Sequence, residues 1–207
     1  MAAAPDPDAE LMRRVKRGDR AAFEALVEKY KQPVANVLGR MLGDPVEAED
    51  LTQGVFVQVF RSAHRYRESA RFSTWLYTIA RTLCLNELRR RSRHPAESLD
   101  AAHPDDPSQP LHRVSDARTL SPPERLLQQE LEQKIQEALD ALPSNQRLAV
   151  LLCRQEDVSY EEIARILKCS LSATKSLIHR GRETLKQRLK PYLRTGQWQD
   201  PRGGQQL

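Results

Sequence analysis

The sequence predicts an all-α protein built from two small helical domains. Glycine is scarce, with 8 residues in 207, and no run of residues resembles a buried strand. Leu, Ala, Glu, Arg and Gln dominate, and these residues favour helices. A proline-rich, acidic stretch without apolar periodicity interrupts the helical patterns. We therefore predict domains at residues 8–93 and 122–190, joined by a flexible acidic linker at residues 94–121.

The first two helices are predicted from their caps and apolar spacing. Asp8 is suited to cap a short helix that ends at Arg17 and is closed by Gly18. Asp19 then caps a longer helix that we expect to bend near Pro33 and to end at Gly43.

The third helix has a compact start signal. Asp44-Pro45-Val46-Glu47 places an N-cap, a proline at the first helical position and a glutamate three residues after the cap. We predict that this helix runs to about His64. Its expected core face consists of Val55, Phe56, Val59 and Phe60.

The fourth helix, FSTWLYTIARTLCLNELRRRSR at residues 72–93, joins aromatic residues, an apolar stripe and a basic end. One interpretation is an amphipathic core helix whose arginines are solvated. The other takes in the preceding polar loop, residues 66–71, which contains Tyr66. Aromatic rings beside arginines are suited to hold unpaired nucleic-acid bases.

Four helices are predicted in the second half. Ser121-Pro122-Pro123-Glu124 starts the first, Ser144 caps the second, and Ser159 caps the third with Glu162 three residues later. After a short turn, the fourth is expected from about Ser172 to Lys190, stopped by Pro191. The last two have the lengths and the turn of a helix-turn-helix.

Composition narrows the functional classes. The net charge of +5 and pI near 9.3 favour a polyanionic partner. No apolar run approaches the roughly 20 residues needed to span a bilayer, and the N-terminus lacks signal-peptide features. Three cysteines without paired spacing indicate reduced cytosolic thiols. No phosphate-binding loop, metal-ligand cluster or nucleophilic triad is recognisable, so we predict a cytoplasmic non-enzyme without cofactor or metal.

Two separated motifs resemble those of one protein family. AEDLTQGVF at residues 48–56, together with residues 72–82, resembles the promoter-melting domain of bacterial sigma factors of the extracytoplasmic-function (ECF) group. SYEEIARIL at residues 159–167 and TKSLIHRGRETL at residues 174–185 resemble the domain of that group that recognises the −35 promoter element. The resemblance implies a subunit that binds core RNA polymerase and directs it to promoters.

The resemblance also implies roles for individual residues. The implied contacts with core polymerase are Glu49, Asp50 and Gln53. The implied contacts with the −10 element are Ser62, Tyr66, Phe72, Ser73, Trp75, Arg81 and Thr82. The implied contacts with the −35 element are Ser172, Thr174, Lys175, Ser176, His179, Arg180 and Arg182.

Partners follow from the same resemblance. They are the largest and second-largest polymerase subunits, promoter DNA in duplex and single-stranded form, and an anti-sigma factor. Tyr66 is expected to provide most of the base capture. The linker is expected either to follow the RNA-exit path of the polymerase or to serve as a plain spacer.

Four residues, at three places in the sequence, depart from the family pattern. Gly54 stands where glutamate is usual, Ala173-Thr174 where Thr-Val is common, and Thr82 where asparagine is common. A single hydroxyl cannot make the bidentate contact of asparagine, so we expect altered −10 discrimination at Thr82.

Two other classes of function remain open from the sequence. One is a free-standing, dimeric helix-turn-helix regulator whose first half senses a ligand or partner. The other is a protein-interaction module without a role in DNA binding. Co-purification with core polymerase separates both from the sigma-factor interpretation.

Overall fold

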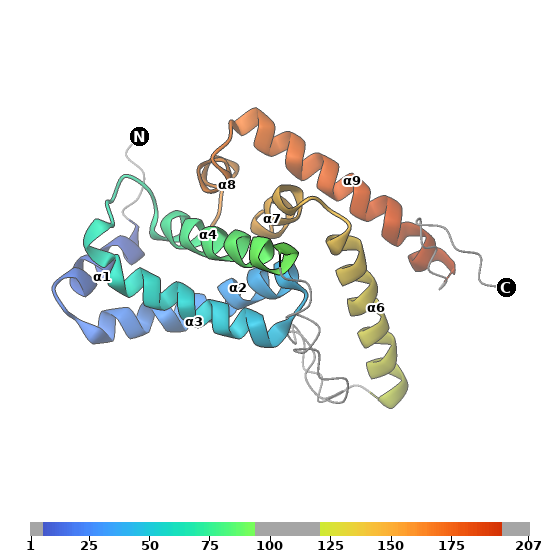
Figure 1. Ribbon diagram of the computed structural model, residues 1–207, viewed down its shortest axis with the longest axis horizontal. Helices are drawn as coiled ribbons and strands as arrows, with labels where there is room; N and C mark the ends of the chain where they lie inside the picture. The colour runs from blue at the N-terminus through green and yellow to red at the C-terminus, as the bar shows by residue number, and fades with distance from the viewer. Residues whose placement is uncertain (1–5, 94–120, 196–207) are drawn as a thin grey trace.

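The computed structural model describes residues 6–93 and 121–195, and those residues form α-helices joined by short turns (Figure 1). The first half contains α1 (Pro7–Lys16), α2 (Arg20–Leu42), α3 (Pro45–Arg61), the 3-10 turn η1 (Ala63–Arg65) and α4 (Phe72–Arg93). The second half contains α6 (Pro122–Asp140), α7 (Ser144–Leu152), α8 (Tyr160–Leu167) and α9 (Leu171–Thr195). The predicted all-α class is confirmed. Most of the predicted linker lies outside the described residues.

Local capping chemistry explains most helix starts. Asp19 Oδ1 accepts a hydrogen bond from the Ala22 amide at 3.1 Å. Asp44 Oδ1 accepts from the amides of Val46 and Glu47 at 2.9 and 3.1 Å. Each carboxylate satisfies amides that the helix itself leaves unpaired. Gly43 closes α2 at φ 71°, a left-handed conformation that glycine adopts without strain.

The predicted cap of α1 was wrong. Asp6 is the cap, and its Oδ1 accepts from the Asp8 amide at 3.1 Å. Asp8 lies inside the helix and is buried, where it accepts from Tyr30 Oη at 2.5 Å and from Lys29 Nζ at 2.7 Å. Burial and this carboxylate raise the pKa of Tyr30, so its hydroxyl remains a donor. The bonds from Asp8 to Lys29 and Tyr30 therefore hold α1 against α2.

Two predicted helix ends were also wrong. α3 ends at Arg61, and the 3-10 turn follows it toward Tyr66. α9 does not stop at Pro191 but continues to Thr195. Proline removes one helical hydrogen bond, yet the following Tyr192 is buried and interacts with Glu130 of α6. Packing on α6 therefore holds the last turn in place.

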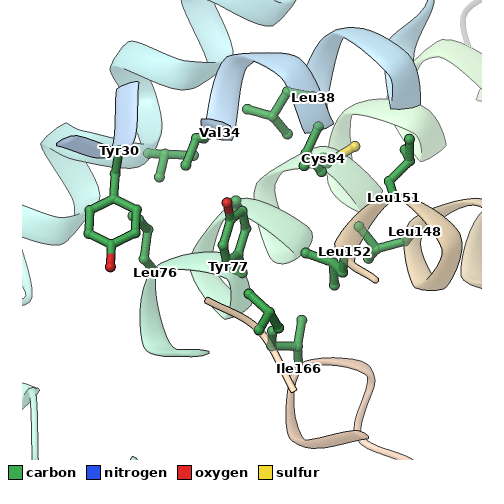
Figure 2. Packing of buried hydrophobic residues seen from close by; sticks show 14 of the residues in the cluster. Tyr30, Val34, Leu38, Leu76, Tyr77, Cys84, Leu148, Leu151, Leu152 and Ile166 are labelled. Atoms are coloured by element: carbon green, nitrogen blue, oxygen red, sulfur yellow. The ribbon is translucent and has the colours of Figure 1, made fainter. Parts of the chain in front are cut away.

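The two halves pack against each other through α4, α2, α7 and α8 (Figure 1). Figure 2 shows Tyr77 and Cys84 of α4 facing Leu148 and Leu152 of α7 and Ile166 of α8. These residues are buried in one continuous apolar cluster that spans both halves. Burial raises the pKa of the Cys84 thiol to about 12.

Polar contacts border this interface. Gln136 Nε2 donates to the Arg40 carbonyl at 3.2 Å, and Arg147 donates to the Met41 carbonyl at 2.9 Å. Arg91 of α4 donates to the Leu42 carbonyl at 2.9 Å. The last carbonyls of α2 lack helical partners, so side chains from α4, α6 and α7 together cap this helix end.

None of the helices that the structure describes is long and apolar enough to cross a membrane.

Candidate functional site

The helix-turn-helix of α8 and α9 is shaped by local signals. The Ser159 hydroxyl accepts from the Glu162 amide at 3.3 Å, and the Glu162 carboxylate accepts from the Ser159 amide at 2.7 Å. This is the predicted capping box. Lys168 ends α8 at φ 57°, in the left-handed region, and turns the chain toward α9. Ser170 Oγ then accepts from the Ala173 amide at 3.1 Å.

A close approach between helices fixes the orientation of α9. A Cβ atom on Gly181 would lie 2.6 Å from Val150 Cγ2 of α7 and 3.4 Å from the Gln146 carbonyl oxygen. Only glycine leaves room for α7 at this crossing, while Ile178 packs into the core beside it. Gly181 was not predicted to have a role, although an isolated glycine within a helical pattern is the signal for such a contact.

The exposed face of α9 carries hydroxyls and cations. Six of the seven residues predicted to contact the −35 element are exposed: Ser172, Lys175, Ser176, His179, Arg180 and Arg182. Arg182 Nη2 also lies 3.1 Å from Cys153 Sγ, to which it donates. This combination of donors on a formed helix suits contacts with phosphates and base edges in the major groove.

Thr174 does not belong to that face. Its side chain is buried, with 0% exposed, because it shares the inward side of α9 with Ile178. Its hydroxyl donates to the Ser170 carbonyl at 3.0 Å and lies 3.2 Å from Cys169 Sγ. In this structure Thr174 therefore stabilises the turn between α8 and α9 and is not available to DNA.

The exposed face of α3 carries the residues predicted to bind core polymerase. Glu49, Asp50 and Gln53 are all exposed. A Cβ on Gly54 would meet no atom within 4 Å, so the departure from glutamate leaves open space beside this face.

Phe60 was wrongly predicted to face the core. It is 53% exposed and packs against Phe23 of α2, with ring centroids 5.1 Å apart and the ring planes tilted by 60°. Because the interval from Gln53 to Val57 and Phe60 is four and then three residues, these side chains follow the same side of α3. Val57 is also exposed, so the polar face continues into an apolar end.

The aromatic residues predicted to contact the −10 element form a buried cluster. Tyr66 is only 1% exposed, and its ring centroid lies 5.3 Å from that of Trp75 and 6.2 Å from that of Phe72. Phe72 is fully buried and also packs edge-on against Tyr30 at 5.3 Å. Only Trp75 of these three keeps a partly exposed side chain. The expected stacking face of Tyr66 is therefore covered in this structure.

The pKa of the Tyr66 hydroxyl is shifted in the direction expected for a buried phenol. Its pKa is raised to about 12, mainly by burial and then by the nearby carboxylates of Asp6 and Glu68. The phenol hydroxyl therefore stays protonated at neutral pH and lies 3.4 Å from the Ala70 carbonyl. The ring supports the conformation of residues 66–71.

The remaining predicted −10 residues are spread over two elements. Ser62 Oγ donates to the Gln58 carbonyl at 2.5 Å, and Thr82 Oγ1 donates to the Thr78 carbonyl at 2.8 Å. Both hydroxyl oxygens retain acceptor capacity. Ser73 is buried. Arg81 is half-buried, and its Nε finds no hydrogen-bond partner within the described residues.

Glu162, which was predicted only to help start α8, lies between the two halves. Glu162 of α8 is buried, accepts from Thr74 Oγ1 of α4 at 3.2 Å and lies 3.6 Å from Arg71 Nε. Its capping-box position identified its local role, but no sequence signal links it to residue 74.

Within residues 6–93 and 121–195, no three His, Cys, Asp or Glu side chains are arranged to hold a metal ion. Cys84, Cys153 and Cys169 are free thiols.

Comparisons with known proteins give a consistent family. The sigma-70 region 2 model matches residues 26–94, and the sigma-70 region 4 model matches residues 132–185. The chain is 34% identical to the RNA polymerase sigma-H factor of Pseudomonas aeruginosa, over 91% of this chain and 97% of that protein. It is 32% identical to the ECF RNA polymerase sigma-E factor of Escherichia coli K12, over 90% and 96%.

Two solved structures share the fold. The structure of CnrH in complex with the cytosolic domain of CnrY superposes with a TM-score of 0.65 at 21% identity, covering 90% of this chain and 99% of that one. The sigma factor RpoE in complex with the anti-sigma factor NepR from Bartonella quintana gives a TM-score of 0.62 at 21% identity, covering 81% and 96%.

Proposed function

This chain belongs to the ECF group of bacterial sigma factors, which direct promoter-specific transcription, and from that premise we propose how its surfaces divide the work. The observation that carries the proposal is the formed, exposed polar face of α9 on the second helix of a helix-turn-helix. RNA polymerase carries out the catalysis, and this protein acts in the cytoplasm as a specificity subunit without catalytic activity of its own.

We assign −35 recognition to Lys175, Arg180 and their exposed neighbours on α9. Cations at these positions reach phosphates and guanine edges, while Ser172 and Ser176 supply shorter donors. The burial of Thr174 removes it from this set.

We assign the polymerase contact to the exposed face of α3. Glu49, Asp50 and Gln53 supply its polar part, and Val57 and Phe60 supply an apolar end against which a partner helix can pack. Half-exposed aromatic and aliphatic side chains beside polar ones are typical of interface anchors. The partner is a helical segment of the largest polymerase subunit, and the second-largest subunit completes the assembly.

We assign the −10 contact to the surface around Trp75, Thr82 and residues 66–71. Extruding a base from the stack costs a few kcal/mol, which stacking and edge contacts must offset. Trp75 is the partly exposed ring available for stacking, and Thr82 offers a hydroxyl on the same side of α4, seven residues further on. Tyr66 and Phe72 form the buried support beneath that surface.

An anti-sigma factor is the remaining proposed partner. Both solved relatives of this fold were captured with another protein bound, one of them a named anti-sigma factor. Because α4 packs against α8 and α2 packs against α7, such a partner would meet both halves of this chain as one surface.

The test uses the full-length protein with bacterial core RNA polymerase. Asp50→Arg combined with Gln53→Ala should abolish most co-purification with core polymerase and leave the fold intact, because both positions are exposed. Glu28→Arg is the control, because it makes the same charge reversal at an exposed position of α2. Unchanged co-purification of the α3 variant would contradict the assignment of this face.

Wild-type holoenzyme should also select promoters from a template library with randomised −10 and −35 elements. If the selected promoters share one sequence at the −10 element and one at the −35 element, the protein recognises both elements as a sigma factor does. A dimeric regulator would instead bind duplex DNA without core polymerase, with two symmetric half-sites.

A further inference from the structure

Residues 66–71, called here the −10 loop, and the first amide of α4 are held by two side chains of α1 and by its N-cap, Asp6. Lys16 Nζ donates to the Tyr66 carbonyl, Arg13 Nε lies 3.1 Å from Glu68 Oε1, and Asp6 Oδ2 accepts from the Phe72 amide at 2.8 Å. We propose that α1 is a positioning element that clamps the −10 loop for base capture. This inference rests on the −10 assignment proposed above.

Asp6 joins two helices that begin 65 residues apart in the chain, at Pro7 and Phe72. Its Oδ1 caps α1 and its Oδ2 caps the first amide of α4. Arg71, the residue before α4, has no side-chain oxygen with which to cap the helix itself. A carboxylate at a helix N-terminus also interacts favourably with the helix dipole. The start of α4 is therefore defined by α1.

Arg13 and Lys16 are three residues apart and lie on one side of α1. Arg13 is held between Glu68 at 3.1 Å and Glu10 at 2.6 Å. Lys16 also places its ammonium group 5.6 Å from the centroid of the Tyr66 ring. Together with Asp6, these side chains hold the beginning, the middle and the end of the −10 loop.

Helix α1, which carries the clamp, is packed firmly against the rest of the first half. Met12 and Val15 of α1 are buried in the core, and Asp8 is fastened to Lys29 and Tyr30 of α2. A site is precise when its supporting side chains sit on a packed element. With the backbone of the −10 loop held in this way, the side chains of Arg67 and Ser69 remain exposed and point away from the core.

The alternative is that α1 merely completes the core. The loop contacts are separable from that role, because Arg13 and Glu68 are half-exposed and such ion pairs contribute little to stability. Removing them should therefore release the loop without unfolding the domain. If base capture changes while the domain stays folded, the side chains of α1 act by positioning the −10 loop.

Four variants test the clamp. Asp6→Ser keeps a good cap for α1 but has one oxygen, which is too short to serve Phe72 as well. Lys16→Met keeps the apolar stem and removes the charge. Arg13→Glu breaks the ion pair with Glu68, and Arg13→Glu with Glu68→Arg restores it. The control is Arg17→Gln, which removes a cation from the end of α1 whose nearest carboxylate, Glu10, lies 4.0 Å away.

The first measurement is hydrogen exchange of the peptide covering residues 66–72 in the full-length protein. Asp6→Ser and Lys16→Met should exchange about tenfold faster there, as expected for loss of a hydrogen bond to a charged group. Arg13→Glu should have a smaller effect of up to about fivefold, because an exposed ion pair contributes at most about 1 kcal/mol. The control and the restored pair should exchange like the wild type. Unchanged exchange in all three single variants would overturn the clamp.

The second measurement is permanganate reactivity of unpaired thymines in a library-selected promoter bound by holoenzyme. Reactivity should fall severalfold in the single variants and recover in the restored pair, while core co-purification and duplex binding stay unchanged. Faster exchange with normal thymine reactivity would overturn the inference but not the −10 assignment. Wild-type holoenzyme that leaves the promoter fully paired would overturn the assignment and the inference with it.

Discussion

Helix α9 exposes six of its predicted DNA contacts on a formed helix, whereas the −10 surface keeps Tyr66 and Phe72 buried. This difference in exposure fits the two proposed targets, which are duplex DNA for α9 and an unpaired base for the −10 surface. A major groove presents base edges to a rigid helix, so the side chains that recognise it need no rearrangement. An unpaired base must leave its stack and enter a supported pocket. In the proposed −10 contact, rings that are already packed would provide that support without further ordering.

The largest expected effect concerns the accessibility of the two regions to a thiol reagent. Burial raises the pKa of Cys84 on α4 from 9.0 to about 12, which lowers its thiolate fraction at pH 8 by roughly a thousandfold. Cys153 and Cys169, close to α9, are partly exposed. We expect alkylation at pH 8, followed by mass spectrometry, to label Cys153 and Cys169 long before Cys84.

The raised pKa of Cys84 determines how the stability of the folded protein changes with pH. Burial of the neutral thiol contributes to stability below about pH 9, and this contribution is lost as the pH rises toward 12. Raising the pH through that window should therefore favour states in which Cys84 is exposed. Equal labelling of all three thiols at pH 8 would contradict the packing of α4 against α7 and α8.

The second prediction concerns stability. Phe72→Ala should lower the free energy of unfolding by about 3–5 kcal/mol, because a fully buried ring is lost. Phe60→Ala is the matched control and should cost clearly less, since Phe60 is half-exposed. Urea denaturation measures both. Equal costs would mean that Phe72 is not a core residue and that the −10 surface is as open as α9.

The third prediction concerns α9. Lys175→Ala and Arg180→Ala should leave stability within about 0.5 kcal/mol of the wild type because both side chains are exposed. A lost phosphate contact lowers the salt slope of DNA binding by about one, and a lost base contact relaxes specificity by about 1–3 kcal/mol.

Promoter binding by holoenzyme across a salt series measures these changes. The neighbouring buried position provides a control, since Thr174→Val should cost about 1 kcal/mol of stability through its lost hydroxyl bonds and keep the salt slope. Wild-type binding by both the Lys175 and Arg180 variants would mean that another face of α9 meets the DNA.

The smallest expected effect is at Gly54. Gly54→Ala should raise the free energy of unfolding by about 0.5–1 kcal/mol, because the added Cβ meets no neighbour and helix propensity improves. Thermal unfolding measures the change. Destabilisation would show that the chain approaches Gly54 more closely than the structure indicates.

Local chemistry explains which elements were predictable from sequence. Asp19, Asp44 and Ser159 cap the helices they were predicted to cap, because each signal acts within three residues. Asp8 was mistaken for a cap because Asp6 and Asp8 are equivalent in a local pattern. The choice between them is made by Lys29 and Tyr30, which are distant in the chain.

Among the site residues too, those governed by local spacing were predictable and those governed by distant contacts were not. The exposure of Lys175 and Arg180 follows from helical periodicity, and so does the burial of Thr174, four residues before Ile178. That spacing was available in the sequence but was outweighed by the resemblance. The burial of Tyr66 had no local signal, because α1 and Trp75 cover its ring from elsewhere in the chain.

The shared cap at the end of α2 has a consequence for synthesis on the ribosome. The first half of the chain emerges before Gln136 and Arg147 have been translated, and domains generally fold as they emerge. Until those residues arrive, the carbonyls of Arg40 and Met41 depend on water. Among the described residues of the first half, Arg91 and the Gly43 amide, which donates to the Gly39 carbonyl at 2.8 Å, support the last turn. We therefore expect the end of α2 to fray in the nascent first half until α6 and α7 have been translated and supply their side chains.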